Sequence, residues 1–588
     1  MRPQLQALRA AMATRGIDAY LVPTADPHGS EYVGDHFACR AWVSGFTGSA
    51  GTLLVFPQWA GLWTDGRYFL QARDQLAGSG IRLMEQGQPG VPTIEDFLRD
   101  SLQHGQVLGF DGRCVDAWTG SRYAALARRR GARIEDRHDL VGEIWTDRPP
   151  RSARPIWAMD PQWSGRSRRD KLARLRADVQ NAGCTVHLLT SLTDIAWLLD
   201  LRGDDIACTP VFLAYFALTP FGCTLFVQPE ALSPALRDAL AADGVAVQDY
   251  DGFYDFVAHL PAEGRVLLDT RRVSLRVLAT LPEGLTYTDA PDPTDARKAV
   301  KTAAECAGSR RAHLADGLAL TRFLYWLKTN VGRVPMTERS AAERLEELRR
   351  ADPDYLGPSF DPILAYGPHG AIVHYSATAE TDAPLAAESF LLADTGGHYR
   401  CGTTDCTRTY ALGPLTDEQR THYTAVLRGH LALGAVTFRA GCTGRDLDVL
   451  ARQPLWAMGL DYDHGTGHGV GHVLSVHEGP QSISRRSGGR EVPLRPGMIT
   501  SNEPGLYLAG RYGIRLEDLT LCVERQPGFL GFETLTCTPF DRDAIAANEL
   551  TAAERTLLDD YHAWVRTTLT PLLPPDEAAW LAQATRPL

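Results

Sequence analysis

The chain of 588 residues has only four lysines, Lys171, Lys298, Lys301 and Lys328, and its basic charge comes almost entirely from arginine. Its formal net charge is −11, and the arginines form no basic stripe. Proteins that bind nucleic acid generally present such a stripe, so we do not expect a nucleic-acid partner. The bias towards arginine and alanine is interpreted as genome composition.

Long hydrophobic runs are also missing. The most apolar stretch, residues 211–227, is shorter than a comfortable membrane span, and Pro220 and Gly222 interrupt its middle. We therefore predict a buried hairpin there and no membrane segment. The first 22 residues lack the apolar core of a signal peptide and are predicted to form an amphipathic helix that enters a strand.

Cysteine is present but follows no functional pattern. The eleven cysteines are odd in number, are scattered, and form no CxxC pair. This excludes a disulfide framework and a thiolate metal site. Cys401 and Cys406 are expected to be small core residues, and the whole pattern favours a cytoplasmic protein.

The length suggests roughly three to five domains. A weak internal duplication relates residues 4–55 to residues 171–228: each segment reads as an amphipathic helix, a short apolar strand, a polar stretch and an apolar strand pair. Two similar α/β domains are predicted, at 1–154 and 155–295. The connection between them, residues 147–157, is rich in proline and arginine.

Residues 296–540 form the predicted catalytic domain, followed by a helical extension at 541–588 that we expect to pack on it. Helical patterns and antiparallel strand patterns are segregated here rather than alternating, which indicates the α+β class. Thr416 and Gln419 have the spacing of a capping box and predict the start of a helix.

Two aspartates interrupt strand patterns in this domain. Asp394 and Asp405 lie in apolar or threonine-rich segments, where a carboxylate would be costly to bury without a cation. Gly396 and Gly397 favour a turn shortly after Asp394.

Two glutamates behave similarly. Glu503 follows an apolar strand pattern and precedes Pro504, and Glu517 lies inside the segment IRLEDLTL. Strand alternation places Glu517 on the same face as Leu519 and Leu521, which is the inward face if it is the core.

The segment 461–480 combines glycines with four histidines, and its glycine spacing fits neither the Walker pattern nor the dinucleotide fingerprint. His464, His468, His472 and His477 fall within fourteen residues, which favours chemistry over structure. His374 has apolar flanks, and a buried structural histidine is as consistent with them as a catalytic one.

Together these residues predict a metal site made of Asp394, Asp405, His468, Glu503 and Glu517. An oxygen-rich set of this kind suits Mn²⁺ or a similar ion. Four carboxylates exceed the charge of one divalent cation, whereas two ions about 3.5–4 Å apart would balance them and could activate a water. A metallohydrolase is the leading hypothesis. A serine hydrolase that uses Ser49 would lack the G-x-S-x-G elbow, and a glycine-rich turn explains that segment better.

These motifs also carry a family resemblance, seen in IVHYS, DTGGHYRCGTTDCTRT, HGTGHGVGHVLSVHEGP, NEPG and GIRLED. They resemble the pita-bread metallopeptidases, specifically the Xaa-Pro aminopeptidases (aminopeptidase P). The three-domain subgroup is indicated by SGFTGSAGTLLV, LWTDGRYFLQA, TSLTDIAWLLDLRGDDI and YHAWVRTTLTPLL. The resemblance implies a C-terminal pita-bread catalytic domain preceded by two creatinase-like α/β domains.

The resemblance also implies residue roles. The five metal-site residues would bind two divalent ions, Mn²⁺ with Co²⁺ or Zn²⁺ as alternatives, with Asp405 and Glu517 bridging them and Glu503 acting as general acid/base. The substrate-binding and proton-shuttling histidines would be His374, His464 and His477. Asn502 departs from the family, which often has aspartate there, and His398 and His472 match no motif position.

The implied activity is release of the N-terminal residue from peptides with proline in second position. The implied partners are such peptides and a second copy in a homodimer, in the cytoplasm, with no nucleic acid and no membrane. A prolidase-like dipeptidase would use the same chemistry. A non-catalytic pita-bread binding module is disfavoured, because such proteins typically lose ligands and all five are present.

Overall fold

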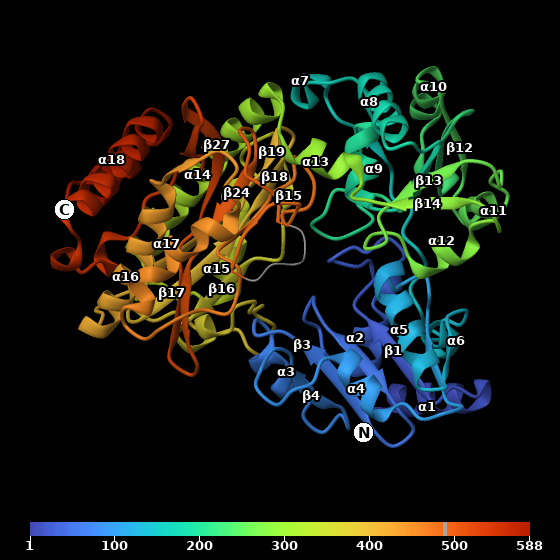
Figure 1. Ribbon diagram of the computed structural model, residues 1–588. Coiled ribbons are helices and arrows are strands. Elements are labelled where there is room, and N and C mark those ends of the chain that lie inside the picture. Colours follow the sequence, from blue (N-terminus) through green and yellow to red (C-terminus); the bar gives the residue numbers. More distant parts are fainter. Residues whose placement is uncertain (486–490) are drawn as a thin grey trace. The chain divides into compact units, whose positions relative to one another are not determined.

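The computed structural model describes residues 1–485 and 491–588 (Figure 1). The chain divides into two compact units, the first made of Met1–Met159 and Arg166–Asp295, the second of Asp160–Gly165 and Ala296–Leu588. None of the helices in the described residues is long and apolar enough to cross a membrane.

The first unit contains two six-stranded sheets with the same topology. One has the order β4-β3-β2-β1-β5-β6 and the other β12-β11-β10-β8-β13-β14. Each sheet has two antiparallel and three parallel pairs of neighbouring strands, and the pairs follow in the same order in the two sheets. The strands of the first sheet are β1 (Ala19–Pro23), β2 (Thr52–Val55), β3 (Ala60–Thr64), β4 (Arg82–Glu85), β5 (Val107–Phe110) and β6 (Arg133–Glu135). Those of the second are β8 (Val186–Leu189), β10 (Ala214–Thr219), β11 (Gly222–Val227), β12 (Val245–Asp249), β13 (Arg265–Leu268) and β14 (Thr286–Asp289).

The helices follow the same duplication. Helix α1 (Pro3–Arg15) precedes β1, as α8 (Arg168–Asn181) precedes β8, and each buries leucines on one face. The other helices of this unit are α2 (Cys39–Ser44), α3 (Phe69–Gln75), α4 (Ile94–Ser101), α5 (Ala117–Arg129), α6 (Leu140–Ile144), α9 (Leu192–Leu199), α10 (Pro234–Ala242), α11 (Phe253–Ala258) and α12 (Leu275–Thr280). The predicted duplication is confirmed, and so is the predicted hairpin at 211–227, which is β10 and β11.

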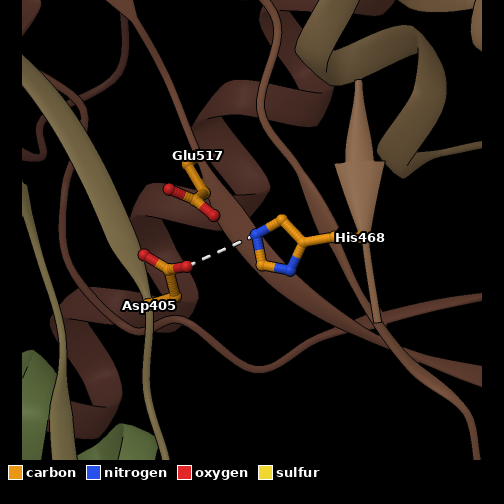
Figure 2. A group of neighbouring side chains, drawn as sticks. All are labelled: Asp405, His468 and Glu517. Carbon is orange, nitrogen blue, oxygen red and sulfur yellow. Dashed lines mark ion pairs between the residues drawn. The ribbon is translucent and has the colours of Figure 1, made fainter. Parts of the chain in front are cut away.

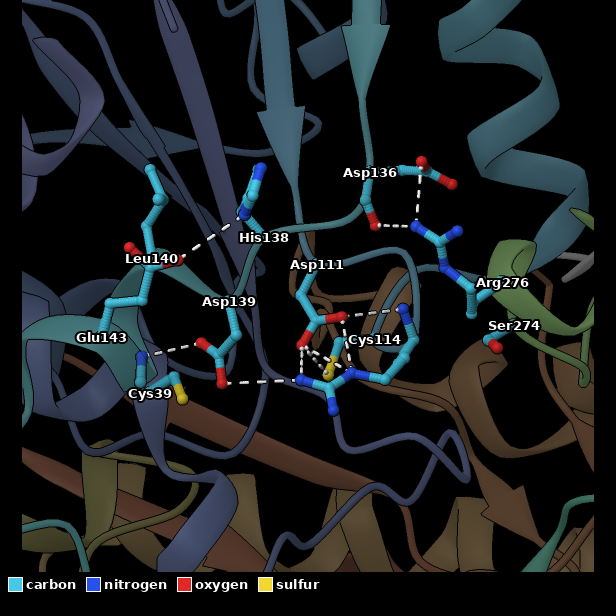
Figure 3. A network of polar contacts seen from close by, with 12 residues as sticks. Cys39, Asp111, Cys114, Asp136, His138, Asp139, Leu140, Glu143, Ser274 and Arg276 are labelled. Atoms are coloured by element: carbon cyan, nitrogen blue, oxygen red, sulfur yellow. Dashed lines mark hydrogen bonds and ion pairs between the residues drawn. The ribbon is translucent and has the colours of Figure 1, made fainter. Parts of the chain in front are cut away.

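The two halves of this unit meet through equivalent turns. Asp116 caps α5, Ser274 caps α12, and the two residues form an antiparallel bridge. Beside them, Leu275 N donates to the Val115 carbonyl at 2.8 Å, and Ala117 N donates to the Val273 carbonyl at 2.9 Å. Figure 3 shows the polar network next to this junction, where Arg276 donates to Asp136. A strand-turn-helix unit is therefore repeated about a local pseudo-twofold axis.

The second unit is built from antiparallel strands and separate helices, so the α+β prediction is confirmed (Figure 1). Its main strands are β15 (Tyr355–Pro358), β16 (Ile363–Tyr366), β17 (Phe390–Thr395), β18 (Gly397–Tyr399), β19 (Gly402–Thr403), β20 (Cys406–Ala411), β21 (Thr437–Arg439), β22 (Gly467–His468), β23 (Ser482–Ile483), β24 (Ile499–Asn502), β25 (Gly505–Leu508), β26 (Tyr512–Arg515), β27 (Asp518–Gln526) and β28 (Phe529–Thr534). Its main helices are α14 (Ala303–Asn330), α15 (Glu338–Arg349), α16 (Asp417–Gly434), α17 (Gly444–Trp456), α18 (Ala552–Leu569) and α19 (Pro575–Ala584). Helix α13 (Pro293–Ala299) carries the chain from the first unit into the second.

Local predictions in this unit had different outcomes. The capping box of Thr416 and Gln419 opens α16 as predicted. The turn predicted at Gly396 and Gly397 is wrong, because the chain continues into β18 and reverses after Tyr399. Gly396 instead allows close packing: a Cβ there would lie 2.1 Å from both the Ser359 Oγ and the Thr404 carbonyl oxygen.

Helix α14 packs closely against the hairpin that leads to Asp405. A Cβ on Gly308, inside this helix, would lie 2.3 Å from the carbonyl oxygen of Cys401, which connects β18 to β19. Backbone atoms cannot rotate away as a flexible side chain can. The glycine therefore sets how closely the helix approaches the segment that carries the aspartate.

We predict that Gly308→Ala lowers the free energy of unfolding by about 1–3 kcal/mol, because the overpacking outweighs the gain in helix propensity. The matched control is Gly434→Ala at the end of α16, where the nearest atom, Asn502 Nδ2, is 3.5 Å from the new Cβ. That control should be neutral or slightly stabilising in urea denaturation. An equally stable Gly308→Ala would contradict the packing argument.

Candidate metal centre

Three of the predicted metal-site residues lie together in the second unit. A carboxylate oxygen of Asp405, a ring nitrogen of His468 and a carboxylate oxygen of Glu517 lie within 4.8 Å of one another (Figure 2). Asp405 precedes β20, His468 ends β22, and Glu517 precedes β27. Three segments far apart in sequence thus converge on one point.

Backbone pairing brings these segments together. Asp394 on β17 pairs with Thr407 on β20. Glu517 N donates to the Thr407 carbonyl at 3.0 Å, and Thr407 Oγ1 donates to Glu517 Oε2 at 2.8 Å. Glu503 N donates to the Thr466 carbonyl at 2.8 Å, which ties the NEPG segment to the histidine segment. Hydrogen bonds between distant segments therefore fix the backbone that carries Asp394, Glu503 and Glu517.

The ring of His468 has a defined orientation. Its Nδ1 lies 3.0 Å from the Gly469 carbonyl, which can only accept, so Nδ1 carries a proton. Its Nε2 lies 3.5 Å from both Asp405 Oδ2 and Glu503 Oε1. Burial lowers the pKa of His468, but the ion pairs with Asp405 and Glu503 outweigh it and raise the pKa to about 9. The surroundings of Nε2 thus favour a positive charge.

The carboxylates are crowded and buried. Burial raises the pKa of Asp394 to about 6, although Arg515 acts to lower it. Burial also raises the pKa of Glu503, and burial together with Asp405, Glu503 and Asp394 raises that of Glu517 well above its usual value. Asp394 Oδ1, Asp405 Oδ1 and Glu517 Oε1 are buried without a hydrogen-bond partner among the described residues. Buried acceptors of this kind require a donor or a cation, so the donor set fits hard divalent ions.

Arg515 and Tyr507 were not identified from the sequence, yet they organise one side of the site. Arg515 is buried; its Nη2 donates to Asp394 Oδ2 at 2.5 Å and its Nη1 donates to the Tyr507 hydroxyl at 2.6 Å. The Tyr507 hydroxyl lies 2.9 Å from His464 Nε2. The sequence did contain a signal for Arg515, because this arginine lies inside the buried strand segment GIRLED. A buried positive charge requires a partner, just as the negative charge of Glu517 does.

Two further predicted histidines lie near these residues. The rings of His477 and His468 are 4.4 Å apart, at an interplanar angle of 80°. His374 is half-buried, and the carbonyl of its neighbour Val373 accepts from Arg515 Nη2 at 3.4 Å. His398, which matched no motif position, is buried with its Nδ1 3.0 Å from Thr403 Oγ1.

Asp518, next to Glu517, is part of a separate ion-pair network. Arg408 donates to Asp518 Oδ1 at 2.7 Å and to the Glu517 carbonyl at 2.6 Å. His430 Nε2 lies 2.9 Å from Asp518 Oδ2, and Asn502 Nδ2 donates to the His430 carbonyl at 2.9 Å. The unusual Asn502 thus supports this network, and Arg408 holds the backbone of Glu517.

The cysteine and serine interpretations agree with the structure. The eleven cysteines form no disulfide in the described chain, and Cys401 and Cys406 are buried core residues. Ser49 lies in the first unit, where its Oγ is 2.6 Å from the Tyr68 hydroxyl. A tyrosine there does not provide the general base that a serine nucleophile needs.

Comparisons with known proteins agree along the whole chain. Residues 4–144 and 147–305 match models of the creatinase/prolidase N-terminal domain, residues 307–524 match metallopeptidase family M24, and residues 528–588 match the C-terminal region of that peptidase family. The predicted family resemblance is confirmed.

Individual relatives match over nearly their full length. A probable Xaa-Pro aminopeptidase P from Coprinopsis cinerea is 38% identical over 100% of this chain and 98% of that protein. Aminopeptidase P2 of Arabidopsis thaliana is 37% identical over 97% of this chain and 86% of that protein. The crystal structure of an X-prolyl aminopeptidase from Caenorhabditis elegans, described as a cytosolic enzyme with a di-nuclear active site, has a TM-score of 0.96 at 34% identity, covering 100% of this chain and 99% of that one. This chain therefore belongs to the Xaa-Pro aminopeptidase P family of M24 metallopeptidases.

Proposed function

We propose that the chain is a dinuclear-metal aminopeptidase that releases the N-terminal residue from peptides with proline in second position. The observation that carries this proposal is the convergence of Asp405, His468 and Glu517, with Glu503 beside His468, in a chain that matches aminopeptidase P over its full length.

Two divalent ions would be held by Asp394, Asp405, His468, Glu503 and Glu517. The unpartnered buried oxygens of Asp394, Asp405 and Glu517 support this assignment. The family resemblance implies that Asp405 and Glu517 would each serve both ions. We assign Mn²⁺ as the metal because oxygen donors predominate; Co²⁺ and Zn²⁺ are the alternatives. When bound, such ions polarise a carbonyl and lower the pKa of a water.

Glu503 is assigned as the general acid/base. Its side chain is 17% exposed against 5% for Asp405, so its carboxylate is the more accessible to substrate. Its Oε1 accepts from Ser501 Oγ at 3.2 Å, which limits its rotation. A positioned, accessible carboxylate can take up a proton and pass it to the departing amine.

The histidines around the centre are assigned to the substrate. His464 donates from Nδ1 to the Gly465 carbonyl and, when neutral, accepts from the Tyr507 hydroxyl at Nε2, while that hydroxyl accepts from Arg515; these contacts hold the ring of His464 for substrate binding. We assign His477, whose ring lies beside that of His468, to donate a hydrogen bond to the peptide carbonyl. His374 is assigned to substrate binding and, with Glu503, to shuttling a proton to the proline nitrogen, which as a tertiary amide nitrogen needs a proton to leave.

The remaining assignments are also proposals. The domains run 1–154, 155–295, 296–540 and 541–588. The absence of disulfides among the described residues is compatible with the reducing cytoplasm that we propose as the location. A homodimer would cover Val449, Trp456 and Met458, which are 40–44% exposed on and just after α17.

The substrate assignment predicts the specificity of the enzyme. With Mn²⁺ present, kcat/KM on Arg-Pro-Pro should exceed that on Gly-Pro and on the control Arg-Ala-Pro by about 100-fold or more. The release of free arginine or glycine measures it. Comparable cleavage of Gly-Pro would favour the dipeptidase. No cleavage after reconstitution with Mn²⁺, Co²⁺ or Zn²⁺ would favour the binding module.

The metal assignment predicts a gain in stability on metal binding. Each ion that binds only the folded chain, at 100 times its Kd, should raise the free energy of unfolding by about 2.7 kcal/mol. Thermal melts of chelated protein titrated with Mn²⁺ measure this gain. Asp405→Ala should abolish it, whereas Glu524→Ala, which removes an exposed carboxylate from β27, should preserve it. An unchanged response in Asp405→Ala would refute the assignment.

The role of Glu503 predicts a separation of turnover from metal binding. Glu503→Gln keeps the size and one oxygen donor but cannot carry the proton, so kcat should fall by about 10² or more while most of the metal remains bound. Kinetics and metal content are measured on the same sample. Activity that falls only in proportion to lost metal would show that Glu503 is a ligand and nothing else.

A further inference from the structure

Two of the four lysines meet one glutamate in the interior of the second unit. Lys298, Lys301 and Glu478 are each no more than 5% exposed. Lys298 Nζ lies 3.8 Å from Glu478 Oε2, and Lys301 Nζ lies 3.5 Å from Glu478 Oε1. Lys301 Nζ also donates to the Lys298 carbonyl at 2.9 Å. We refer to these three residues as the Glu478 cluster.

The charge balance of this cluster differs from that of the other two lysines. Lys171 pairs with Asp200, and Lys328 pairs with Asp541 and Asp543, so neither ammonium shares its carboxylate with another lysine. In the Glu478 cluster two buried ammonium groups share one carboxylate. Both Glu478 oxygens are buried without a hydrogen bond among the described residues, so charge attraction holds the carboxylate. Removing that carboxylate would take its negative charge away from two buried ammonium groups.

The cluster is connected directly to the histidine segment. Glu478 N donates to the Gly469 carbonyl at 2.7 Å, and His468 Nδ1 donates to the same carbonyl oxygen at 3.0 Å. Glu478 also follows His477 in the chain. The position of Glu478 therefore fixes the acceptor that orients the His468 ring and the backbone that carries His477.

The cluster also accounts for two of the glycines in HGTGHGVGH. A Cβ on Gly469 would lie 2.1 Å from the Glu478 carbonyl oxygen, and a Cβ on Gly471 would lie 2.9 Å from Glu478 Oε2. The segment after His468 is thus wrapped closely around Glu478, which only glycine permits.

We propose that Glu478, held by Lys298 and Lys301, is a positioning residue that sets the orientation of His468 and His477. It acts through the Gly469 carbonyl and the chain, and it does not contact substrate. The proposal rests on the proposed function of this site. A hydrogen-bond partner that orients a metal-binding histidine typically changes metal affinity or activity by about 10- to 100-fold when it is lost.

Glu478→Gln tests the proposal, because it keeps the shape and removes the charge. We expect Mn²⁺ affinity, measured by calorimetry, or kcat to fall by about 10- to 100-fold. In the metal-free protein, the amides of Gly469, Gly471 and Glu478 should exchange hydrogen faster, while those of β17 and β20 should not. The hydrogen-exchange measurement does not depend on activity, so it tests this proposal separately from the proposed function. If the proposed function is wrong, the wild-type protein itself will be inactive.

Lys301→Met is the second variant and Lys328→Met its matched control. Both lose an ion pair with a buried carboxylate of the second unit, but only Lys301 belongs to the Glu478 cluster. Lys301→Met should show the same faster amide exchange and the same lower Mn²⁺ affinity as Glu478→Gln. Lys328→Met should lower only the free energy of unfolding. Wild-type exchange and affinity in a folded Glu478→Gln would overturn the proposal. Failure of both cluster variants to fold beside a folded Lys328→Met would also overturn it, because the cluster would then be a folding requirement.

Discussion

The burial of negative charge around His468 is the constraint on which the second unit depends. Asp394, Asp405 and Glu517 each have a buried oxygen without a hydrogen bond in the described chain, and Glu503 lies beside them. Charges in such a place are unfavourable unless cations compensate them. The protein supplies only part of this compensation, through Arg515 on Asp394 and a high pKa on His468. Two divalent ions would compensate the remaining negative charge.

Buried cations arrange the residues around the centre. Arg515 orients Asp394 and Tyr507, Arg408 holds the backbone of Glu517 through its carbonyl, and the lysines of the Glu478 cluster anchor the histidine segment. Each of these contacts fixes a residue or segment of the site. The contacts leave Asp394 Oδ1 and Glu517 Oε1 without a hydrogen bond among the described residues. Such a rigid surround reduces the reorganisation needed when ions and substrate bind.

The sequence predicted the fold class, the duplicated sheets and the convergence of Asp405, His468 and Glu517, because apolar patterns and misplaced charges are local signals. It named Glu517 rather than its neighbour Asp518, but strand alternation alone does not justify that choice, because both faces of β27 are buried at this end. It missed Arg515 and Glu478 because their partners, Asp394 and Lys298, are distant in sequence and meet only through tertiary pairing. Gly396 was read as a turn although it serves close packing.

The central claim is that this charge is balanced by two ions in each chain. The most direct measurement is the metal content of the purified protein by mass spectrometry, after reconstitution with excess Mn²⁺ and removal of free ions. The account predicts two equivalents per chain. One equivalent, or none with Mn²⁺, Co²⁺ or Zn²⁺, would contradict it.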